Sequence, residues 1–250
     1  MTKKYQHFSE TVAILILLCG VFIAGIGAFF PQEAISLPTD AGVGLDAGNA
    51  ENTVTIVIDA GHGGEDGGTQ SADGLYEKDV NLEIAQLLDT MLRANGISTV
   101  MTRSEDILLY DRNADYRGHK KMLDLATRRK IAEETENAVF VSIHMNAFPE
   151  SKYRGLQVFY SPNHPQAMTL ASVIQHDAQS YLQPDNNRKI KSSTSAIYLL
   201  DRLECPAVLI ECGFLSNPDE AALFATDQYR KEVAFVIFSS LISYISGLDA

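Results

Sequence analysis

The sequence predicts a single α/β domain over residues 53–250, with a mainly parallel, twisted sheet and helices on both faces. Apolar, β-branched runs typical of strands buried on both faces alternate along the chain with segments of helical periodicity. Strands that are joined through helices form parallel sheets, which the helices then cover. About 200 residues remain after the N-terminal segments, enough for one sizeable domain.

The first half of this domain begins with the continuous β-branched run TVTIVID, residues 53–59, which predicts a buried strand. A helix is expected over 78–96, because apolar residues recur at helical spacing and the segment closes on Asn-Gly, a common helix C-terminus. Residues 97–102 predict the second strand, and the polar, irregular residues 103–119 predict a long surface loop.

The second half repeats the alternation, and a basic loop, DNNRKIKSS, interrupts it before the last strand. Apolar runs again indicate strands, and helical periodicity indicates helices. The expected elements are a helix over 121–137, strands over 138–144 and 155–162, a helix over about 164–182, a short strand around 197–200, a buried strand over 206–214, and closing helices across 219–246.

An apolar segment precedes the domain. Val12–Phe30 is a run of 19 residues without charge or proline, long enough for a helix to cross a bilayer. Lys3 and Lys4 stand before it, so the positive-inside rule places the remainder of the chain outside the cytoplasm. A cleaved signal peptide is the alternative to a membrane anchor, and both predict export. Residues 31–52 are rich in Gly, Ala, Pro and Asp and predict a flexible linker.

Charge and cysteine content exclude some classes of protein. The formal net charge of −12 repels phosphate backbones, so we expect no nucleic-acid partner. Three cysteines are too few for a disulfide framework. Cys205 and Cys212 follow the N-terminal segment, and the sequence leaves open whether they form one bridge or remain buried thiols.

Polar side chains stand at the ends of three expected strands. His62 follows the first in AGHGG, His144 ends the run AVFVSIH, and Glu211 ends AVLIE. In open α/β sheets, ligands bind beyond the carboxyl ends of the strands, so we expect these side chains to converge. Two histidines and a carboxylate are typical of a catalytic Zn²⁺ site with three protein ligands and one open position.

The third ligand is less directly indicated. Glu77, at the start of the first helix, is preferred because the glycine-rich loop returns there. The loop carboxylates Asp59, Glu65 and Asp66 are alternatives that more often surround a ligand than bind the metal. Glu211 then remains free to act as general base. A phosphate loop is excluded, because GHGGEDGG lacks the G-K-[ST] ending, and its glycines are expected to turn the chain so that His62 points inward.

Five ordered motifs resemble those of zinc-dependent N-acetylmuramoyl-L-alanine amidases of the amidase-3 type. They are VIDAGHGGEDGG, EKDVNLEIA, TRSED, SIHMNA and IECGFLSNPDE, and the resemblance covers about residues 53 to 248. It implies hydrolysis of the amide between N-acetylmuramic acid and L-alanine in peptidoglycan. Carried over by position, it implies His62, Glu77 and His144 as zinc ligands, with Glu211 as the catalytic glutamate. It therefore selects Glu77 over the loop carboxylates.

The wording of HMNAFPESKYRGLQVFYSP and NNRKIKSSTSAIYLL is similar to a narrower subgroup, the germination-specific spore-cortex amidases. That likeness implies action on the glycan strands and stem peptides of cortex peptidoglycan, leading to muramic lactam, with an accessory lipoprotein as a candidate partner. Asp59 and Asn146 are candidates for orienting the ligands, and Arg188, Lys189 and Lys191 for binding stem-peptide carboxylates. Two other functions stay open: a non-catalytic peptidoglycan-binding or scaffold protein on the same fold, and a zinc hydrolase of another amide.

Overall fold

The computed structural model describes residues 54–111, 113 and 118–248. The expected N-terminal anchor or signal segment, residues 1–30, and the expected linker, residues 31–52, lie outside the described residues. Among the helices that are described, none has the length and apolar character needed to cross a bilayer. The described part of the chain is one compact unit, which begins before the first strand and runs to the C-terminal helix.

Six strands form one sheet in the order β2-β1-β3-β6-β4-β5. The strands are β1 (Thr55–Ala60), β2 (Ser98–Met101), β3 (Ala138–Asn146), β4 (Gln157–Tyr160), β5 (Lys191–Ser192) and β6 (Ala207–Phe214). Strands β2, β1, β3 and β6 are parallel neighbours, whereas β4 runs antiparallel to β6 and β5 runs parallel to β4. The expected mainly parallel sheet is therefore a mixed sheet, parallel through its centre.

The reversal at β4 follows from the connection that leads into it. Only residues 147–156 join β3 to β4, and they contain no helix. A parallel strand needs a crossover of a dozen or more residues, usually helical, so this connection returns the chain in the opposite direction. As a result, residues 147–156 lie at the same edge of the sheet as the carboxyl ends of β1, β3 and β6.

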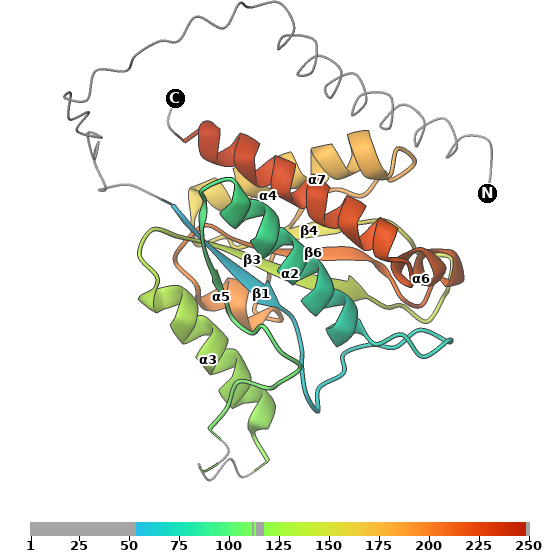
Figure 1. Ribbon diagram of the computed structural model, residues 1–250, viewed down its shortest axis with the longest axis horizontal. Helices are drawn as coiled ribbons and strands as arrows, with labels where there is room; N and C mark the ends of the chain where they lie inside the picture. The colour runs from blue at the N-terminus through green and yellow to red at the C-terminus, as the bar shows by residue number, and fades with distance from the viewer. Residues whose placement is uncertain (1–53, 112, 114–117, 249–250) are drawn as a thin grey trace, which may run out of the picture. The chain divides into compact units, whose positions relative to one another are not determined.

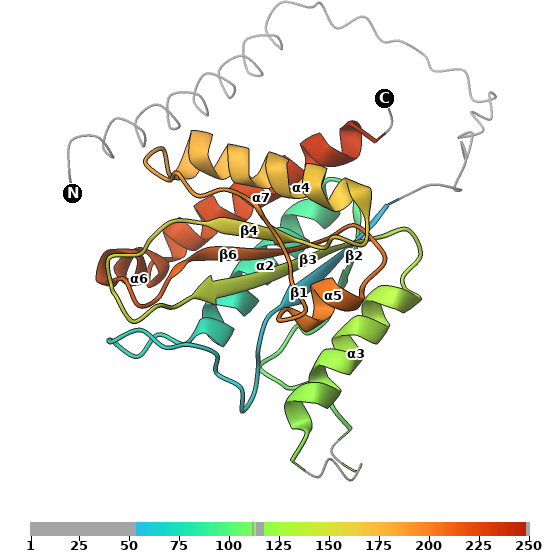
Figure 2. The same cartoon turned by 180° about the vertical axis from the view of Figure 1, so that it is seen from behind.

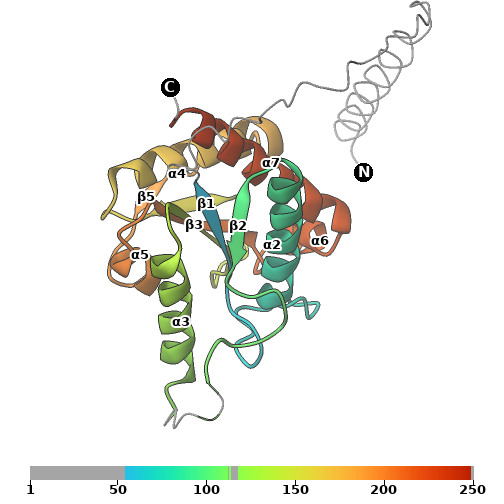
Figure 3. The ribbon, with the colours of Figure 1, turned by 60° about the vertical axis from the view of Figure 1, so that its left-hand side comes forward.

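Helices cover both faces of the sheet, as expected (Figures 1 and 2). On one face, helices α2, α4 and α7 pack on a large apolar core that includes Ile56, Val141 and Ile210 from the strands. On the other face, α3 and α5 pack on a smaller core around Phe140 and Leu209. Figure 3 shows the sheet between these two layers. The helical elements are α2 (Glu77–Ala94), α3 (Lys120–Glu134), α4 (Pro165–Asp177), which continues as a π-helical segment η2 (Ala178–Leu182), α5 (Tyr198–Arg202), α6 (Pro218–Phe224) and α7 (Asp227–Ser246).

One expected element is wrong. Residues 197–200 were expected to form a short strand, but the chain there forms the short helix α5. Short apolar runs do not distinguish a strand from a buried helical turn. Leu199, Leu200 and Leu203 are all buried on the smaller core, which a helical turn allows and an alternating strand does not. The edge strand is instead Lys191–Ser192, inside the basic loop, where it pairs with Phe159 and Tyr160.

Candidate metal centre

The first candidate ligand, His62, stands on the loop that leaves β1. Its backbone φ is 61°, a left-handed conformation that residues other than glycine rarely adopt. This turn directs the imidazole back toward the start of α2, where Nε2 lies 3.2 Å from Oε1 of Glu77. On the other side of the ring, Nδ1 lies 2.9 Å from Oδ2 of Asp66. The chain therefore bends at His62 itself, in addition to its neighbouring glycines.

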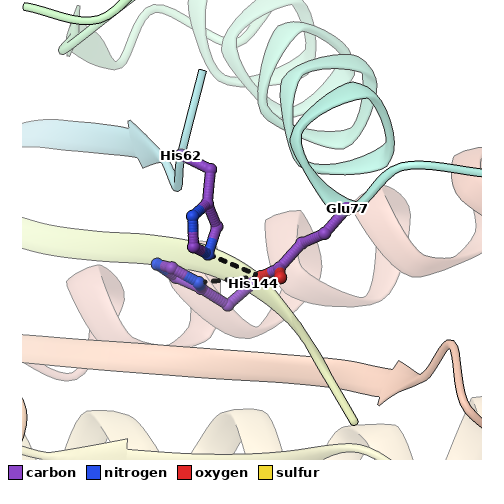
Figure 4. A group of neighbouring side chains, drawn as sticks. All are labelled: His62, Glu77 and His144. Carbon is purple, nitrogen blue, oxygen red and sulfur yellow. Dashed lines mark hydrogen bonds and ion pairs between the residues drawn. The ribbon is translucent and has the colours of Figure 1, made fainter. Parts of the chain in front are cut away.

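Glu77 is the first residue of α2 and is 3 % exposed. Its Oε1 lies 3.0 Å from Nδ1 of His144 and accepts a hydrogen bond of 3.0 Å from the main-chain N–H of Met145. Its Oε2 accepts a hydrogen bond of 2.8 Å from the main-chain N–H of Thr69. These contacts fix the carboxylate between the two histidines (Figure 4).

The glycines of the loop also make room for the neighbouring side chains. A Cβ on Gly61 would clash with the ring of His144, and a Cβ on Gly68 would clash with the carboxylate of Glu77. Gly68 has, in addition, a φ of 67°, which glycine adopts at little cost. The expectation that the glycines serve His62 is thus incomplete, because two of them give space to the other two candidate ligands.

Glu211 lies on β6 directly opposite His144 of β3 and Gln157 of β4. Its Oε2 is buried and has no hydrogen-bond partner within the described part of the chain. A buried carboxylate oxygen without a partner costs free energy in a folded protein and is uncommon outside functional sites. Of the two glutamates of this group, Glu211 is therefore the one with an unpartnered carboxylate oxygen in the described part of the chain.

The electrostatic environment separates the two glutamates. Burial alone would raise the pKa of Glu77, but hydrogen bonds from His144 and His62 lower it well below its ordinary value. Burial raises the pKa of Glu211 to about 7; the charge of Glu77 adds to this rise, and the nearby histidines oppose it. Burial opposes protonation of His62, yet Asp66 and Glu77 raise its pKa to about 9. The carboxylate of Glu77 is thus held ionised, and that of Glu211 titrates near neutral pH.

The donor set fits a zinc ion. One ligand atom from each of His62, Glu77 and His144 lies within 4.8 Å of the other two. In tetrahedral zinc sites, ligand atoms about 2.0–2.1 Å from the metal lie about 3.3 Å apart, close to the 3.0 and 3.2 Å that separate Oε1 from the two ring nitrogens. Two imidazoles and one carboxylate also leave a coordination position open, as in catalytic zinc sites.

Other residues singled out by the sequence have different surroundings. Asp59 is buried and accepts hydrogen bonds from Thr102, Ser142 and Arg128. Arg128 also donates to the main-chain carbonyl of His62, so Asp59 is linked to the loop of His62 through this arginine. The main-chain carbonyl of Asn146 accepts a hydrogen bond from Leu215.

Arg188 is engaged inside the chain. It donates to the carbonyl of Arg154 and to Oε1 of Gln157, and its guanidinium lies 4.5 Å from the centre of the Phe214 ring.

Cys205 and Cys212 are free thiols, which resolves the alternative that the sequence left open. Burial raises the pKa of Cys205 to about 11, so this thiol is protonated at neutral pH.

Sequence reasoning missed the arginines that surround the loop of His62. Arg103 and Arg128 are 2 % and 1 % exposed and donate to main-chain carbonyls of this loop. Arg103 belongs to the TRSED motif, whose resemblance to the family implies no role for this arginine. Arg128 sits in a helix whose charges indicate a solvated face, and only its position on the buried side of α3 distinguishes it from Arg129.

Fold and site together define a class of protein: an α/β domain with a candidate metal centre of two histidines and one glutamate at the carboxyl edge of its parallel strands. Residues 56–243 match the family model described as N-acetylmuramoyl-L-alanine amidase, of the amidase-3 type. The chain belongs to this family and is an N-acetylmuramoyl-L-alanine amidase.

Two comparisons place the chain within the family. It is 36% identical over 191 residues to the germination-specific N-acetylmuramoyl-L-alanine amidase of Bacillus subtilis, covering 76% of this chain and 79% of the relative. It is similar to the CwlD amidase of Clostridioides difficile, whose structure was solved in complex with the GerS lipoprotein, with 38% identity and a TM-score of 0.73. That match covers 78% of this chain and 99% of the other.

A third similar protein, also a solved amidase structure, has a lower sequence identity. The amidase AmiC2 of Nostoc punctiforme is 27% identical, with a TM-score of 0.67, and covers 77% of this chain and 97% of the other. The likeness to these two solved structures extends over nearly the whole of each solved chain.

Proposed function

We propose that this amidase is zinc-dependent, with His62, Glu77 and His144 as the metal ligands and Glu211 as the general base. The observation that carries the proposal is the contrast between three side chains that converge from β1, α2 and β3 and a fourth, partnerless carboxylate on the adjacent strand β6. Residues 53–250 form the catalytic domain in this proposal. The ligand assignment agrees with the family resemblance of the sequence motifs.

Bound zinc would polarise the lactyl carbonyl and lower the pKa of a water molecule. Glu211 accepts a proton from the attacking water while the oxygen of that water bonds to the carbonyl carbon. The same carboxyl then donates the proton to the L-alanine nitrogen as the C–N bond breaks, leaving a lactyl carboxylate and a free stem peptide. A pKa near 7 suits a group that must take up and release a proton in one cycle.

The biological setting of the reaction is also a proposal. The likeness to the germination-specific amidase of B. subtilis supports spore-cortex peptidoglycan as the substrate. The complex of the C. difficile amidase with a lipoprotein supports an accessory lipoprotein as partner. The apolar segment Val12–Phe30 supports export, with the domain either anchored at the membrane facing the wall or intermembrane space, or secreted after cleavage.

Mass spectrometry of purified cortex and vegetative peptidoglycan after digestion by the full-length protein tests this proposal. We expect free stem peptides that begin with L-alanine and glycan strands that carry unsubstituted lactyl groups, formed faster from cortex. Cleavage inside the stem peptide would instead assign a hydrolase of another amide. Binding without any release of peptide by the zinc-loaded protein would assign a scaffold.

A further inference from the structure

The TRSED motif, Thr102–Asp106, is not used by the proposed chemistry, yet it lies against the loop that carries His62. We call residues 60–64 the His62 loop. Asp106 accepts a hydrogen bond of 2.7 Å from the main-chain N–H of Gly64 and pairs with Lys78 at 2.6 Å. Lys78 in turn donates to the carbonyl of Gly64. One end of the loop is thus held by a pair of opposite charges.

Arg103 of the same motif holds the beginning of the loop. Its Nε donates to the carbonyl of Ala60 at 2.8 Å, and its Nη2 donates to the carbonyl of Gly61 at 3.0 Å. The same Nη2 reaches the carbonyl of Lys78 at 2.8 Å, in the first turn of α2. Arg103 therefore ties the His62 loop to the helix that carries Glu77.

Arg128, on α3, approaches the loop from the other face of the sheet. Its Nη1 donates to the carbonyl of Ala60 at 2.7 Å, and its Nη2 donates to the carbonyl of His62 at 2.6 Å. Asp59 and Asp124 pair with the same guanidinium at 2.7 and 2.8 Å. Burial alone would lower the pKa of Arg128, but these two carboxylates raise it above its ordinary value.

Two buried cations beside one another are costly to a fold. Burial and the charge of Arg128 lower the pKa of Arg103 to about 10, which still leaves it charged at neutral pH. Both guanidiniums meet at the carbonyl of Ala60, and between them they bond three consecutive carbonyls, those of residues 60–62. This arrangement fixes the main chain where His62 adopts its left-handed conformation.

We propose that Arg103 and Arg128 are positioning residues that set the metal affinity of the centre by holding the main chain of His62. Their hydrogen bonds in the described part of the chain go to main-chain carbonyls and to acidic side chains, not to the side chains of the three candidate ligands, so they act on where the ring points. The inference rests on the proposed function, because it takes His62 as a ligand. Outer partners of a ligand typically contribute a factor of 10–100 to metal affinity, and we expect these arginines to contribute through the backbone at that level.

Zinc titration of the full chain against a chromogenic chelator tests the inference, with thermal unfolding in excess chelator as a measure of the fold. In Arg103→Lys and Arg128→Lys, charge is kept but the branched set of donors is lost. We expect the zinc Kd to rise 10- to 100-fold in each. Turnover at saturating zinc is a second measurement and should recover in part.

Arg230→Lys is the matched control. Arg230 is 8 % exposed, donates to the carbonyl of Phe224 and pairs with Asp227 and Glu83, so it is a buried arginine that holds a main chain other than the His62 loop. We expect a comparable fall in Tm with a zinc Kd within twofold of the parent. A Kd that rises equally in the control and in the two test variants would overturn the inference.

Asp106→Ala keeps the test decisive if the buried arginine variants fail to fold. Its side chain is 47% exposed, so its removal should spare the fold while freeing the N–H of Gly64. We expect a zinc Kd several-fold higher, and an unchanged Kd would contradict the inference that contacts to the main chain of the His62 loop set the metal affinity. If the parent itself binds no zinc, the proposed function fails too. If the parent binds zinc and releases L-alanine peptides while all three variants bind as the parent does, this inference alone fails.

Discussion

Two glutamates of the same centre, the buried Glu77 and the half-buried Glu211, lie in opposite surroundings. Glu77 is held by two histidines and two main-chain N–H groups, and its pKa is lowered. Glu211, on the neighbouring apolar strand, has a partnerless oxygen and a pKa raised to about 7. The difference teaches that residue type does not set the role. Hydrogen bonding keeps one carboxylate ionised, as cation binding requires, and desolvation raises the pKa of the other toward neutral pH, as proton exchange requires.

Glu77→Gln changes the glutamate whose carboxylate is fully hydrogen-bonded, and it should have the largest effect on zinc binding and turnover. The loss of a charged ligand should weaken zinc binding by more than the roughly 100-fold that an outer partner can cost, and turnover should fall with it. Metal content after gel filtration measures this. Glu83→Gln is the control, since Glu83 lies on the same helix and pairs with Arg230 away from the centre. Full zinc content in Glu77→Gln would break the comparison.

Glu211→Gln changes the glutamate whose buried Oε2 has no hydrogen-bond partner in the described part of the chain. General acid–base catalysis contributes about 10²- to 10⁴-fold, so kcat should fall by that factor while the zinc Kd stays within twofold of the parent. Steady-state release of stem peptide, measured on zinc-loaded protein, gives kcat. Near-normal turnover would mean that another group moves the proton, and a parallel loss of zinc would make Glu211 a ligand.

The pH dependence of stability gives a third, smaller effect that tests the difference between the two glutamates. The ordinary pKa of a glutamate is 4.5, and that of folded Glu211 is about 7, so the folded protein binds the extra proton within this window. The contribution of Glu211 to stability is therefore fully present below pH 4.5 and is lost as the pH rises to about 7.

Glu211→Gln lacks this titration. In excess chelator, its free energy of unfolding should gain on that of the parent by about 3 kcal/mol across the window, because the rise in the pKa of Glu211 from 4.5 to about 7 corresponds to about 1.36 kcal/mol per pKa unit. Urea unfolding of both proteins at several pH values measures the difference. The contribution of His62, whose pKa is also raised, is common to both proteins. Parallel pH profiles would show that Glu211 titrates as an ordinary glutamate.

Much of the fold follows from the sequence, because the central strands are long apolar runs whose burial leaves little choice of position. The errors occur where runs are short. The helix α5 and the edge strand β5 each span five residues or fewer, and there tertiary contacts with the smaller core and with β4 decide the structure. The antiparallel direction of β4 was readable from its helix-free connection.

The members of the candidate site could be found for a different reason. His62, His144 and Glu211 are polar residues that end apolar runs, which makes them visible in one sequence. Glu77 needed the resemblance to the family, because a first-turn glutamate is common in helices. The arginines that hold the His62 loop act on main-chain carbonyls, which carry no sequence signal.

Zinc titration of the chelator-treated parent, with stem-peptide release followed in the same samples, tests the central claim most directly. The account predicts that release of peptides beginning with L-alanine is absent in excess chelator, rises in proportion to added zinc, and reaches a plateau at one equivalent per chain. Undiminished release in excess chelator, or a plateau unrelated to zinc stoichiometry, would contradict it.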